Sequence, residues 1–452
     1  MAYHPLFEID AFIAQLESEL ENKGGLVRAK RVKVGMSGEG REIWGLRISS
    51  TPEEWEGEEY DWAKAMKTFR FGEVEEVEDI ELEDGKRDTY DYDPSEDIGF
   101  GYATGEEWGW EAEVINEDGT ISWEPIFNER KSKSLSSTAK SKRIKKGFLI
   151  TGAQHSREVS HLFLSPDSHN NSHRKWIATS TALYLAHALT TNATTPGSLG
   201  KLLDEWDFYI VPAPNPDGYD YTWETDRFWY KNRMKTSPDP TCVGVDMNRN
   251  WGYKWRSTVS FLSSSQNTAN ATTTKPPATS PCSPFYPGSR PFQSPEITHI
   301  AAYTESLPNL LAFLDLRSYG QMFSNPFSYT CSKTPKDEEN QLEAAMGAVR
   351  SSLGVYGTKY VVGSLCALFY RAHGNIVDWM YKKAGIKYSY AVHLRDTGTV
   401  SFLFILSLVR AMLMSRNHSV WVCITTPLHQ TCRGGDGCYG RVSSEIHSKN
   451  RK

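Results

Sequence analysis

Residues 147–158 read GFLITGAQHSRE, in which an apolar run ends at Gly152 and the pair His155 and Glu158 follows. A short apolar run bounded by glycine predicts a strand buried in a sheet. An imidazole and a carboxylate three residues apart at a strand end can face one metal ion, and neutral His with ionised Glu suits zinc. The pattern H-x-x-E is frequent by chance, however. Alone, it marks a surface pair more often than a metal site.

Strands and helices alternate on both sides of this stretch. Residues 176–189 have helical character and residues 208–212 form an apolar strand, which gives a β-α-β order. This alternation predicts an α/β fold with a sheet between helices. The other predicted elements are helices at 7–22, 295–307 and 338–353 and strands at 32–34, 43–48, 310–316 and 388–394.

Three more motifs follow in order along the chain, namely Asn215-Pro-Asp-Gly-Tyr219, Cys242-Val-Gly-Val-Asp-Met-Asn-Arg-Asn-Trp251 and Leu394-Arg-Asp-Thr-Gly398. Together with H-x-x-E they resemble the zinc carboxypeptidases of the carboxypeptidase A and B type, the funnelins, in a fungal-like variant. The resemblance covers residues 3–51 and 147–399. It implies a single α/β domain with a mixed, twisted sheet of about eight strands between helices, and a site in a funnel at the strand ends.

The resemblance assigns a zinc site to the first motif. His155 and Glu158 match the first two ligands of one Zn2+ per chain, in a family site of two His and one Glu that keeps a position open for water. The third-ligand position is Arg317, whose guanidinium is always protonated and has no lone pair for a metal. We therefore predict that zinc binding is impaired. The alternative is that His393 replaces the missing imidazole as third ligand.

Two catalytic positions of the family are also substituted. His393 stands at the position of the general base, which is a glutamate in the family, and Tyr230 stands at the position of the arginine that polarises the scissile carbonyl. A histidine can act as a base in principle, because its reference pKa is about 6.5. Loss of one oxyanion donor alone lowers the rate of other enzymes by roughly 100- to 1000-fold.

The residues that hold the substrate in the family are retained. Asn248 and Arg249 match the pair that grips the C-terminal carboxylate of a substrate, a task that suits the planar guanidinium. Arg157 matches an auxiliary carboxylate-binding position, and Tyr370 matches the mobile tyrosine that closes over the bound end. Val377 lies at the floor of the specificity pocket, where an apolar side chain favours a hydrophobic C-terminal residue. The expected partner is a peptide or protein C-terminus.

Three segments fall outside the resemblance. Residues 52–146 form an acidic insertion, which we expect to be partly disordered. Residues 159–175 separate Glu158 from the following helix, and residues 400–452 form a tail unlike the C-terminal helix of the family. The last two segments both begin with Val-Ser, as an in-frame translation of a splice donor would, and we interpret them as retained introns. A genuine loop and a genuine tail are the alternative.

Composition and cysteine placement narrow the class of protein. The net charge of -6 and the pI near 6.1 indicate no cationic face for nucleic acid. The sequence contains no run of about 18 apolar residues, the length needed to span a bilayer. No signal peptide is visible. Cys242 with Cys282 and Cys331 with Cys366 predict two disulfides, with unpaired buried thiols as the alternative. The disulfides and the resemblance predict a secreted protein, which we expect to be a monomer.

Two functions from different classes are consistent with these features. The first is a zinc metallocarboxypeptidase-family protein that releases a hydrophobic C-terminal residue from peptides, with its activity abolished or weakened in this chain. The alternative is a catalytically inactive, carboxypeptidase-like protein that binds peptides. A third interpretation, an unexpressed pseudogene product, fits the intron-like segments.

Overall fold

The computed structural model describes residues 4–50, 60–69, 145–152, 154–157, 176–192, 194–257 and 280–394, together with the backbone of 111–115 and 121–125. The α-helices are α1 (Leu6–Lys23), α2 (Trp62–Thr68), α3 (Ile177–Thr190), α4 (Pro216–Glu224), α5 (Pro295–Ser306), α6 (Glu338–Tyr356), α7 (Leu365–Leu368) and α8 (Ile376–Lys382). The 3-10 turns are η3 (Gly200–Asp204) and η4 (Met247–Arg249). The strands are β1 (Arg28–Met36), β2 (Glu42–Ser49), β3 (Glu111–Ile115), β4 (Ile121–Pro125), β5 (Lys146–Thr151), β6 (Trp206–Val211), β7 (Leu310–Ser318), β8 (Met322–Asn325), β9 (Val361–Ser364) and β10 (Tyr388–Leu394).

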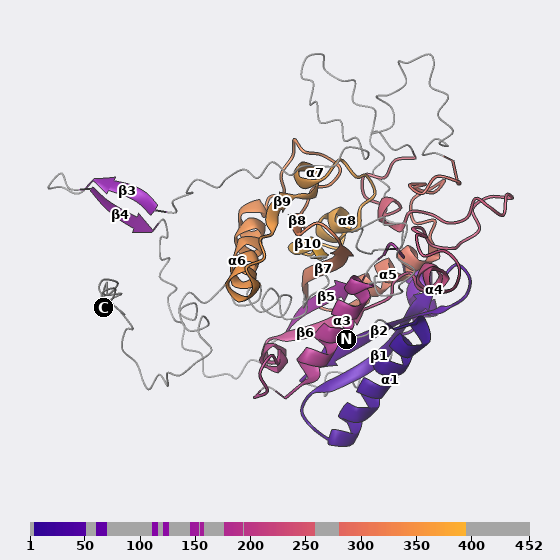
Figure 1. Cartoon of the computed structure of the whole chain (residues 1–452), viewed down its shortest axis with the longest axis horizontal. Coiled ribbons are helices and arrows are strands. Elements are labelled where there is room, and N and C mark those ends of the chain that lie inside the picture. Colours follow the sequence, from indigo (N-terminus) through magenta and orange to yellow (C-terminus); the bar gives the residue numbers. More distant parts are fainter. Residues whose placement is uncertain are drawn as a thin grey trace, which may run out of the picture.

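Eight strands form one mixed sheet in the order β1-β2-β6-β5-β7-β10-β8-β9 (Figure 1). The four central strands β6, β5, β7 and β10 run parallel, and β2 and β8 pair antiparallel with the outer two of them. Strands β3 and β4 form a separate antiparallel hairpin. The α/β fold and the mixed sheet of eight strands expected from the sequence are confirmed.

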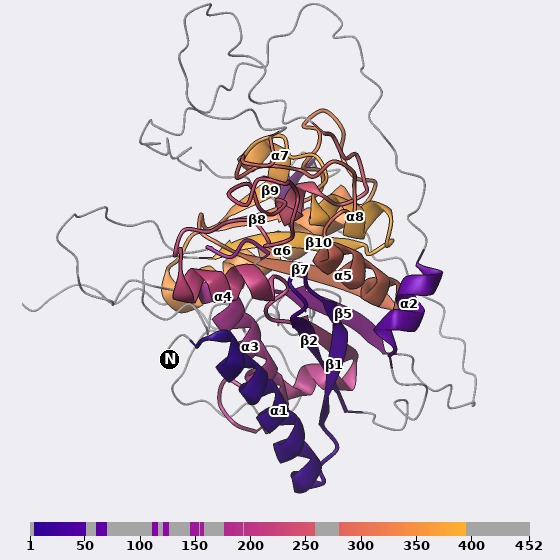
Figure 2. The ribbon, with the colours of Figure 1, turned by 90° about the vertical axis from the view of Figure 1, so that its right-hand side faces the viewer.

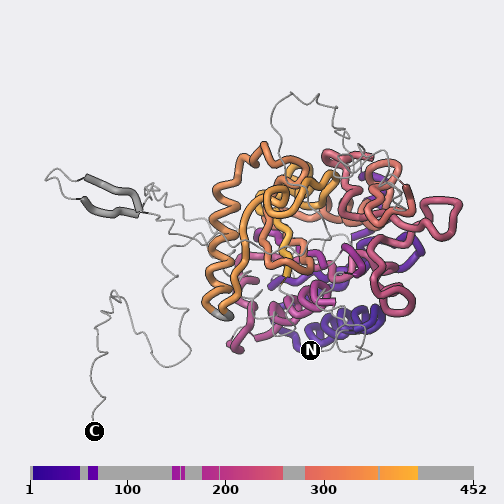
Figure 3. The backbone as a smooth tube through the Cα atoms, turned by 45° about the horizontal axis from the view of Figure 1, so that its top comes forward, coloured from indigo at the N-terminus to yellow at the C-terminus, as the bar shows by residue number. Residues whose placement is uncertain are grey.

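The central strands are buried on both faces of the sheet, and successive side chains of a strand point to opposite faces. In β6, Phe208 and Ile210 join the core formed with α1, α3 and α6, whereas Tyr209 and Val211 join the core formed with α5 and α8. Figure 2 shows α1 and α3 on one side of the strands and α5 and α8 on the other, and Figure 3 shows α1 alongside α3. Burial on both sides explains why residues 208–211 of β6 are a continuous apolar run rather than an alternating one.

The carboxyl ends of the parallel strands meet at one edge of the sheet. Strand β5 ends at Thr151 and leads to His155, while β7 and β10 carry Arg317 and His393 next to their last residues. Arg317 lies directly opposite His393 in the register of these two strands. In open α/β sheets, ligands bind outside the carboxyl ends of the strands. This edge therefore brings together residues that are far apart in the sequence.

The predicted helices and strands are all present, with ends that differ by a few residues. The acidic segment also contributes α2, which the sequence analysis did not predict. Asp61 begins this helix by accepting a hydrogen bond from the backbone N–H of Ala63 at 2.9 Å. Tyr60, next to the cap, packs edge-on against Tyr303 of α5 with ring centroids 4.9 Å apart. Residues 60–69 thus pack against the domain.

Both predicted disulfides are present, one joining Cys242 to Cys282 and the other Cys331 to Cys366. Within the part of the chain that the structure describes, every helix is too short or too polar to cross a bilayer. Three predictions concern residues outside that part: Glu158 as a zinc ligand, the segment 159–175, and the tail 400–452.

Candidate functional site

His155 is held by a buried aspartate. The bend after β5 places its Nε2 2.8 Å from Oδ1 of Asp246, and both side chains are buried. Burial alone raises the pKa of the Asp246 carboxyl, but His155 and Arg249 hold that pKa below its usual value. The carboxylate is therefore ionised and can only accept, so Nε2 of His155 donates the hydrogen bond. A carboxylate that fixes a histidine in this way is the usual partner of a metal-binding imidazole.

The same aspartate organises the carboxylate-binding residues predicted from the sequence. The other oxygen, Oδ2, accepts a hydrogen bond from Nε of Arg249 at 3.0 Å. Oδ1 also accepts from the backbone N–H of Asn248 at 3.1 Å, which fixes the turn η4 that carries both residues. Nη2 of Arg249 donates to the hydroxyl of Tyr370 at 3.2 Å. Arg249, Asn248 and Tyr370 are thus brought together, and Arg249 is only 5% exposed.

Val377, the residue predicted at the floor of the specificity pocket, lies near this cluster. Val377 lies in the first turn of α8 and is fully buried in the core on that side of the sheet. The side-chain oxygen of Asn248 accepts a hydrogen bond from the backbone N–H of Ile376 at 3.1 Å, so η4 and α8 are joined directly. This hydrogen bond uses the side-chain oxygen of Asn248. The donors of the Asn248 side chain are the two N–H groups of its amide nitrogen.

Tyr230 contacts two of the predicted site residues. Its ring stacks on His155 with centroids 3.9 Å apart and planes 21° apart, and the guanidinium carbon of Arg157 lies 4.6 Å from the ring centroid. Burial raises the pKa of the Tyr230 phenol well above its usual value. At the position predicted for the carbonyl-polarising arginine, this chain therefore holds a neutral aromatic group.

Arg317, the residue predicted at the third-ligand position, is buried. Arg317 is 5% exposed, and its Nε and Nη2 lie 2.6 Å and 2.5 Å from Oδ2 of Asp315. Asp315 also accepts from Oγ1 of Thr151 at 2.9 Å and from Nε2 of Gln154 at 3.1 Å. The arginine is therefore anchored from its own strand and from β5. A guanidinium offers donors only, so it cannot bind a metal ion.

His393 lies beside Arg317 and is also buried. Burial, Arg317 and His155 lower the pKa of His393 to about 3, so its imidazole is neutral at physiological pH. The ring of Phe369 stacks over it, with centroids 5.6 Å apart and planes 22° apart. Among the described residues, Nδ1 of His393 is a buried nitrogen without a hydrogen-bond partner. At the position predicted for the general base, the chain therefore holds a neutral imidazole under an aromatic ring.

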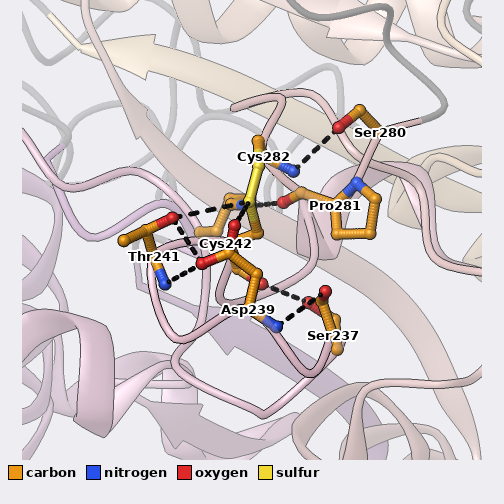
Figure 4. The surroundings of a disulfide bond; sticks show 9 residues. Ser237, Asp239, Thr241, Cys242, Ser280, Pro281 and Cys282 are labelled. Atoms are coloured by element: carbon orange, nitrogen blue, oxygen red, sulfur yellow. Dashed lines mark hydrogen bonds between the residues drawn. A yellow bond between two sulfur atoms is a disulfide. The ribbon is translucent and has the colours of Figure 1, made fainter.

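The described residues do not form a zinc site at this edge of the sheet. The one group of three donor side chains found among them is Asp239, Cys242 and Cys282, whose ligand atoms lie within 4.8 Å of one another. Figure 4 shows that the two sulfurs of this group are bonded to each other, so they are not thiolate ligands. At the position predicted for the third ligand the chain carries the cation of Arg317. The described residues, which do not include Glu158, therefore do not fit a bound zinc ion.

Sequence reasoning did not assign the two aspartates that support the site. Asp246 lies two residues before Asn248 in a motif that was quoted, and an acid in that place is typical of a cap on a short turn. Asp315 alternates with apolar residues in β7, and a charge inside a buried strand indicates a partner. The stacking of Phe369 on His393 has no signal in the sequence, because it depends on tertiary packing.

Comparison with known proteins places the chain in a family. The zinc carboxypeptidase family matches residues 171–410, which is more than half of the chain. Two curated relatives share the name inactive metallocarboxypeptidase ECM14. The one from Blastomyces gilchristii is 36% identical over 250 residues, and the one from Paracoccidioides brasiliensis is 35% identical over 251. Each match covers 51% of this chain and 39% of the relative, so the match spans well under half of the relatives' length.

Solved structures support the fold. Bovine thrombin-activatable fibrinolysis inhibitor, in complex with tick carboxypeptidase inhibitor, is 22% identical with a TM-score of 0.53, over 91% of this chain and 94% of that chain. Carboxypeptidase A from Helicoverpa armigera is 20% identical with a TM-score of 0.55, over 91% of this chain and 74% of that chain. At this identity the likeness concerns the fold alone. The family match and the curated relatives carry the assignment, and the chain belongs to the zinc carboxypeptidase family.

Proposed function

We propose that this protein binds the C-terminal carboxylate of a peptide that ends in a hydrophobic residue, and that it does not hydrolyse the peptide. One observation carries the proposal. Arg249 is buried and fixed by Asp246 and Tyr370, whereas the metal position is filled by Arg317. The carboxylate-binding residues are therefore organised, and the metal-binding residues are not.

Binding would use the planar guanidinium of Arg249. An arginine can form two parallel N–H···O bonds with a carboxylate, and such bonds are among the stronger ones in proteins. Asp246 already orients the guanidinium through Nε, so little side-chain freedom is lost on binding. The NH2 group of Asn248 adds a donor, and the apolar side chain of Val377 favours a hydrophobic last residue. We infer that Arg157 provides a further cation for the peptide chain.

Hydrolysis fails at three points in this chain. Arg317 cannot ligate zinc, the neutral His393 carries no negative charge for a general base, and Tyr230 does not supply the cation that polarises the carbonyl. Each of these groups acts on the transition state rather than on the bound ground state. Their loss removes catalysis without removing affinity for the peptide end.

The family binds zinc in general, and for this chain we propose that no stoichiometric zinc is held. The alternative, in which His393 replaces the third imidazole, makes a different prediction. Tight zinc in the wild type that is lost in His393→Ala would support that alternative. We also propose an extracellular location, because both disulfides require an oxidising compartment to form and persist.

The test compares a peptide ending in phenylalanine with the same peptide as its C-terminal amide. The free acid should bind the wild type at least tenfold more tightly, and Arg249→Gln should abolish this difference, because it removes the charge that pairs with the carboxylate. Titration calorimetry measures both affinities, and chromatography of the mixture measures hydrolysis. Arg290→Gln, at an exposed arginine, is the matched control. Equal affinity for the acid and the amide, or release of phenylalanine that a chelator abolishes, would contradict the proposal.

A further inference from the structure

The loop that follows α3 contains the triplet Asn192-Ala-Thr194. A triplet of the form N-x-S/T is the acceptor motif for N-linked glycans in chains that enter the secretory pathway. Three more triplets of this form, at Asn170, Asn270 and Asn417, lie outside the residues that the structure describes. Asn192 is therefore the acceptor asparagine whose surroundings can be examined.

The side-chain amide nitrogen of Asn192 is accessible. Oδ1 of Asn192 accepts a hydrogen bond from the backbone N–H of Thr194 at 3.1 Å and another from the Thr194 hydroxyl at 3.1 Å. A backbone N–H can only donate, so the atom that it contacts is Oδ1 and the other atom of the amide is Nδ2. Both residues are exposed, and within the described part of the chain Nδ2 makes no hydrogen bond. The atom that would carry a sugar therefore faces no competing contact.

The loop keeps its own hydrogen bonds when Nδ2 is substituted. The backbone carbonyl of Asn192 accepts from the N–H of Thr195 at 2.8 Å, and the hydroxyl of Ser198 donates to the carbonyl of Thr191 at 2.8 Å. Neither of these bonds uses Nδ2, and nor do the two bonds to Oδ1. An N-glycosidic bond replaces one N–H of the amide and leaves Oδ1 as an acceptor. The folded loop can therefore carry a glycan without losing these contacts.

The loop also lies away from the carboxylate-binding residues. Helix α3 follows the carboxyl end of β5 and leads to the amino end of β6, and these two strands run parallel. The loop after α3 therefore belongs to the amino edge of the sheet. His155 and the residues around it lie at the carboxyl edge, so a bulky group on Asn192 would not cover them.

We propose that Asn192 is a site of N-linked glycosylation, with an oligosaccharide on a polyprenyl diphosphate as the donor. Nδ2 forms a bond to C1 of the first sugar, and the bond between C1 and the diphosphate oxygen breaks. The polyprenyl diphosphate leaves with the bonding electrons, and the amide loses one proton. The proposal is independent of peptide binding. It rests on the proposed extracellular location, because the transfer takes place in the secretory lumen, where disulfides also form.

The test expresses the full chain in a eukaryotic host behind a secretory signal peptide, and analyses the medium together with the secretory membranes. A peptide N-glycanase in heavy-oxygen water leaves a labelled aspartate wherever an asparagine carried a glycan, and mass spectrometry of the peptides locates the label. Label at Asn192 is expected. Thr194→Val removes the hydroxyl of the acceptor motif and should abolish the label, whereas Thr194→Ser should retain it. Thr195→Val leaves the triplet intact and is the matched control.

A second readout separates failure of this proposal from failure of the proposed location. Alkylation of free thiols reports whether Cys242–Cys282 and Cys331–Cys366 have formed. A disulfide-bonded chain without label at Asn192 would overturn the glycosylation proposal alone. Free thiols and no label together would overturn the location as well.

Peptide binding tests the placement of the loop. Asn192→Gln removes the acceptor and should leave the affinity for a peptide ending in phenylalanine within about twofold, because the loop and the carboxylate-binding residues lie at opposite edges of the sheet. A larger change would contradict a glycan that lies away from the site.

Discussion

Two buried aspartates support the two halves of the site, and each is paired with an arginine. Asp246 holds Arg249 together with His155, and Asp315 holds Arg317. In the first half the arginine is predicted to match one that the family uses to bind its ligand. In the second half the arginine is predicted to stand at a position that the family uses for a metal ligand. In both halves a buried aspartate fixes the guanidinium, and the two halves differ in the role that the sequence predicts for the arginine.

The pairing of Asp315 with Arg317 should matter most for stability. Asp315→Ala removes the carboxylate that pairs with the buried guanidinium of Arg317, and breaking one side of a buried ion pair costs about 3–5 kcal/mol. Urea denaturation should show a loss of that size in the free energy of unfolding. Adding Arg317→Met to the same chain should recover most of it, since no unpaired charge then remains. A single-variant loss below about 1 kcal/mol would mean that Arg317 finds another counter-charge in the fold.

Much of the fold could be predicted from the sequence because its signals are local. The apolar run before Gly152 predicted β5, and the resemblance implied a site at the strand ends. The site could be predicted only in part. Arg317 and Arg249 could be singled out from their positions in the sequence motifs. The roles of Asp246 and Asp315 could not, because they depend on contacts between segments far apart in the chain. Helix α2 was not predicted, because the sequence around it is acidic and the helix is stabilised by packing against α5.

The metal half of the site should also respond to acid. The pKa of His393 is lowered to about 3 in the folded protein, below its reference value of 6.5. Between these two values the unfolded chain binds a proton that the folded chain does not, so stability falls as the pH decreases below 6.5. Wild type should therefore lose about 2 kcal/mol more than His393→Gln between pH 7 and pH 5.

Urea denaturation of both proteins at the two pH values measures this difference. Because the remaining titratable groups are common to both chains, their effects cancel in the comparison. An identical pH dependence in the two proteins would show that the imidazole is not desolvated in solution, and that this half of the site is open to water rather than closed over by Phe369.

The smallest expected effect lies in the carboxylate-binding half. Tyr370→Phe removes the hydroxyl that accepts a hydrogen bond from Nη2 of Arg249 at 3.2 Å, while Nε of Arg249 remains on Asp246. Since a single hydrogen bond contributes about 0.5–1.5 kcal/mol, affinity for a peptide ending in phenylalanine should fall about two- to tenfold. Calorimetry with Tyr388→Phe as the matched control, at the opposite end of β10 from His393, measures this change. A loss as large as that of Arg249→Gln would mean that Tyr370, rather than Asp246, holds the guanidinium in its binding geometry. Arg249 would then depend on Tyr370, a half-buried loop residue, and not on the buried Asp246. The two halves of the site would no longer be alike, because in the other half a buried aspartate, Asp315, holds Arg317.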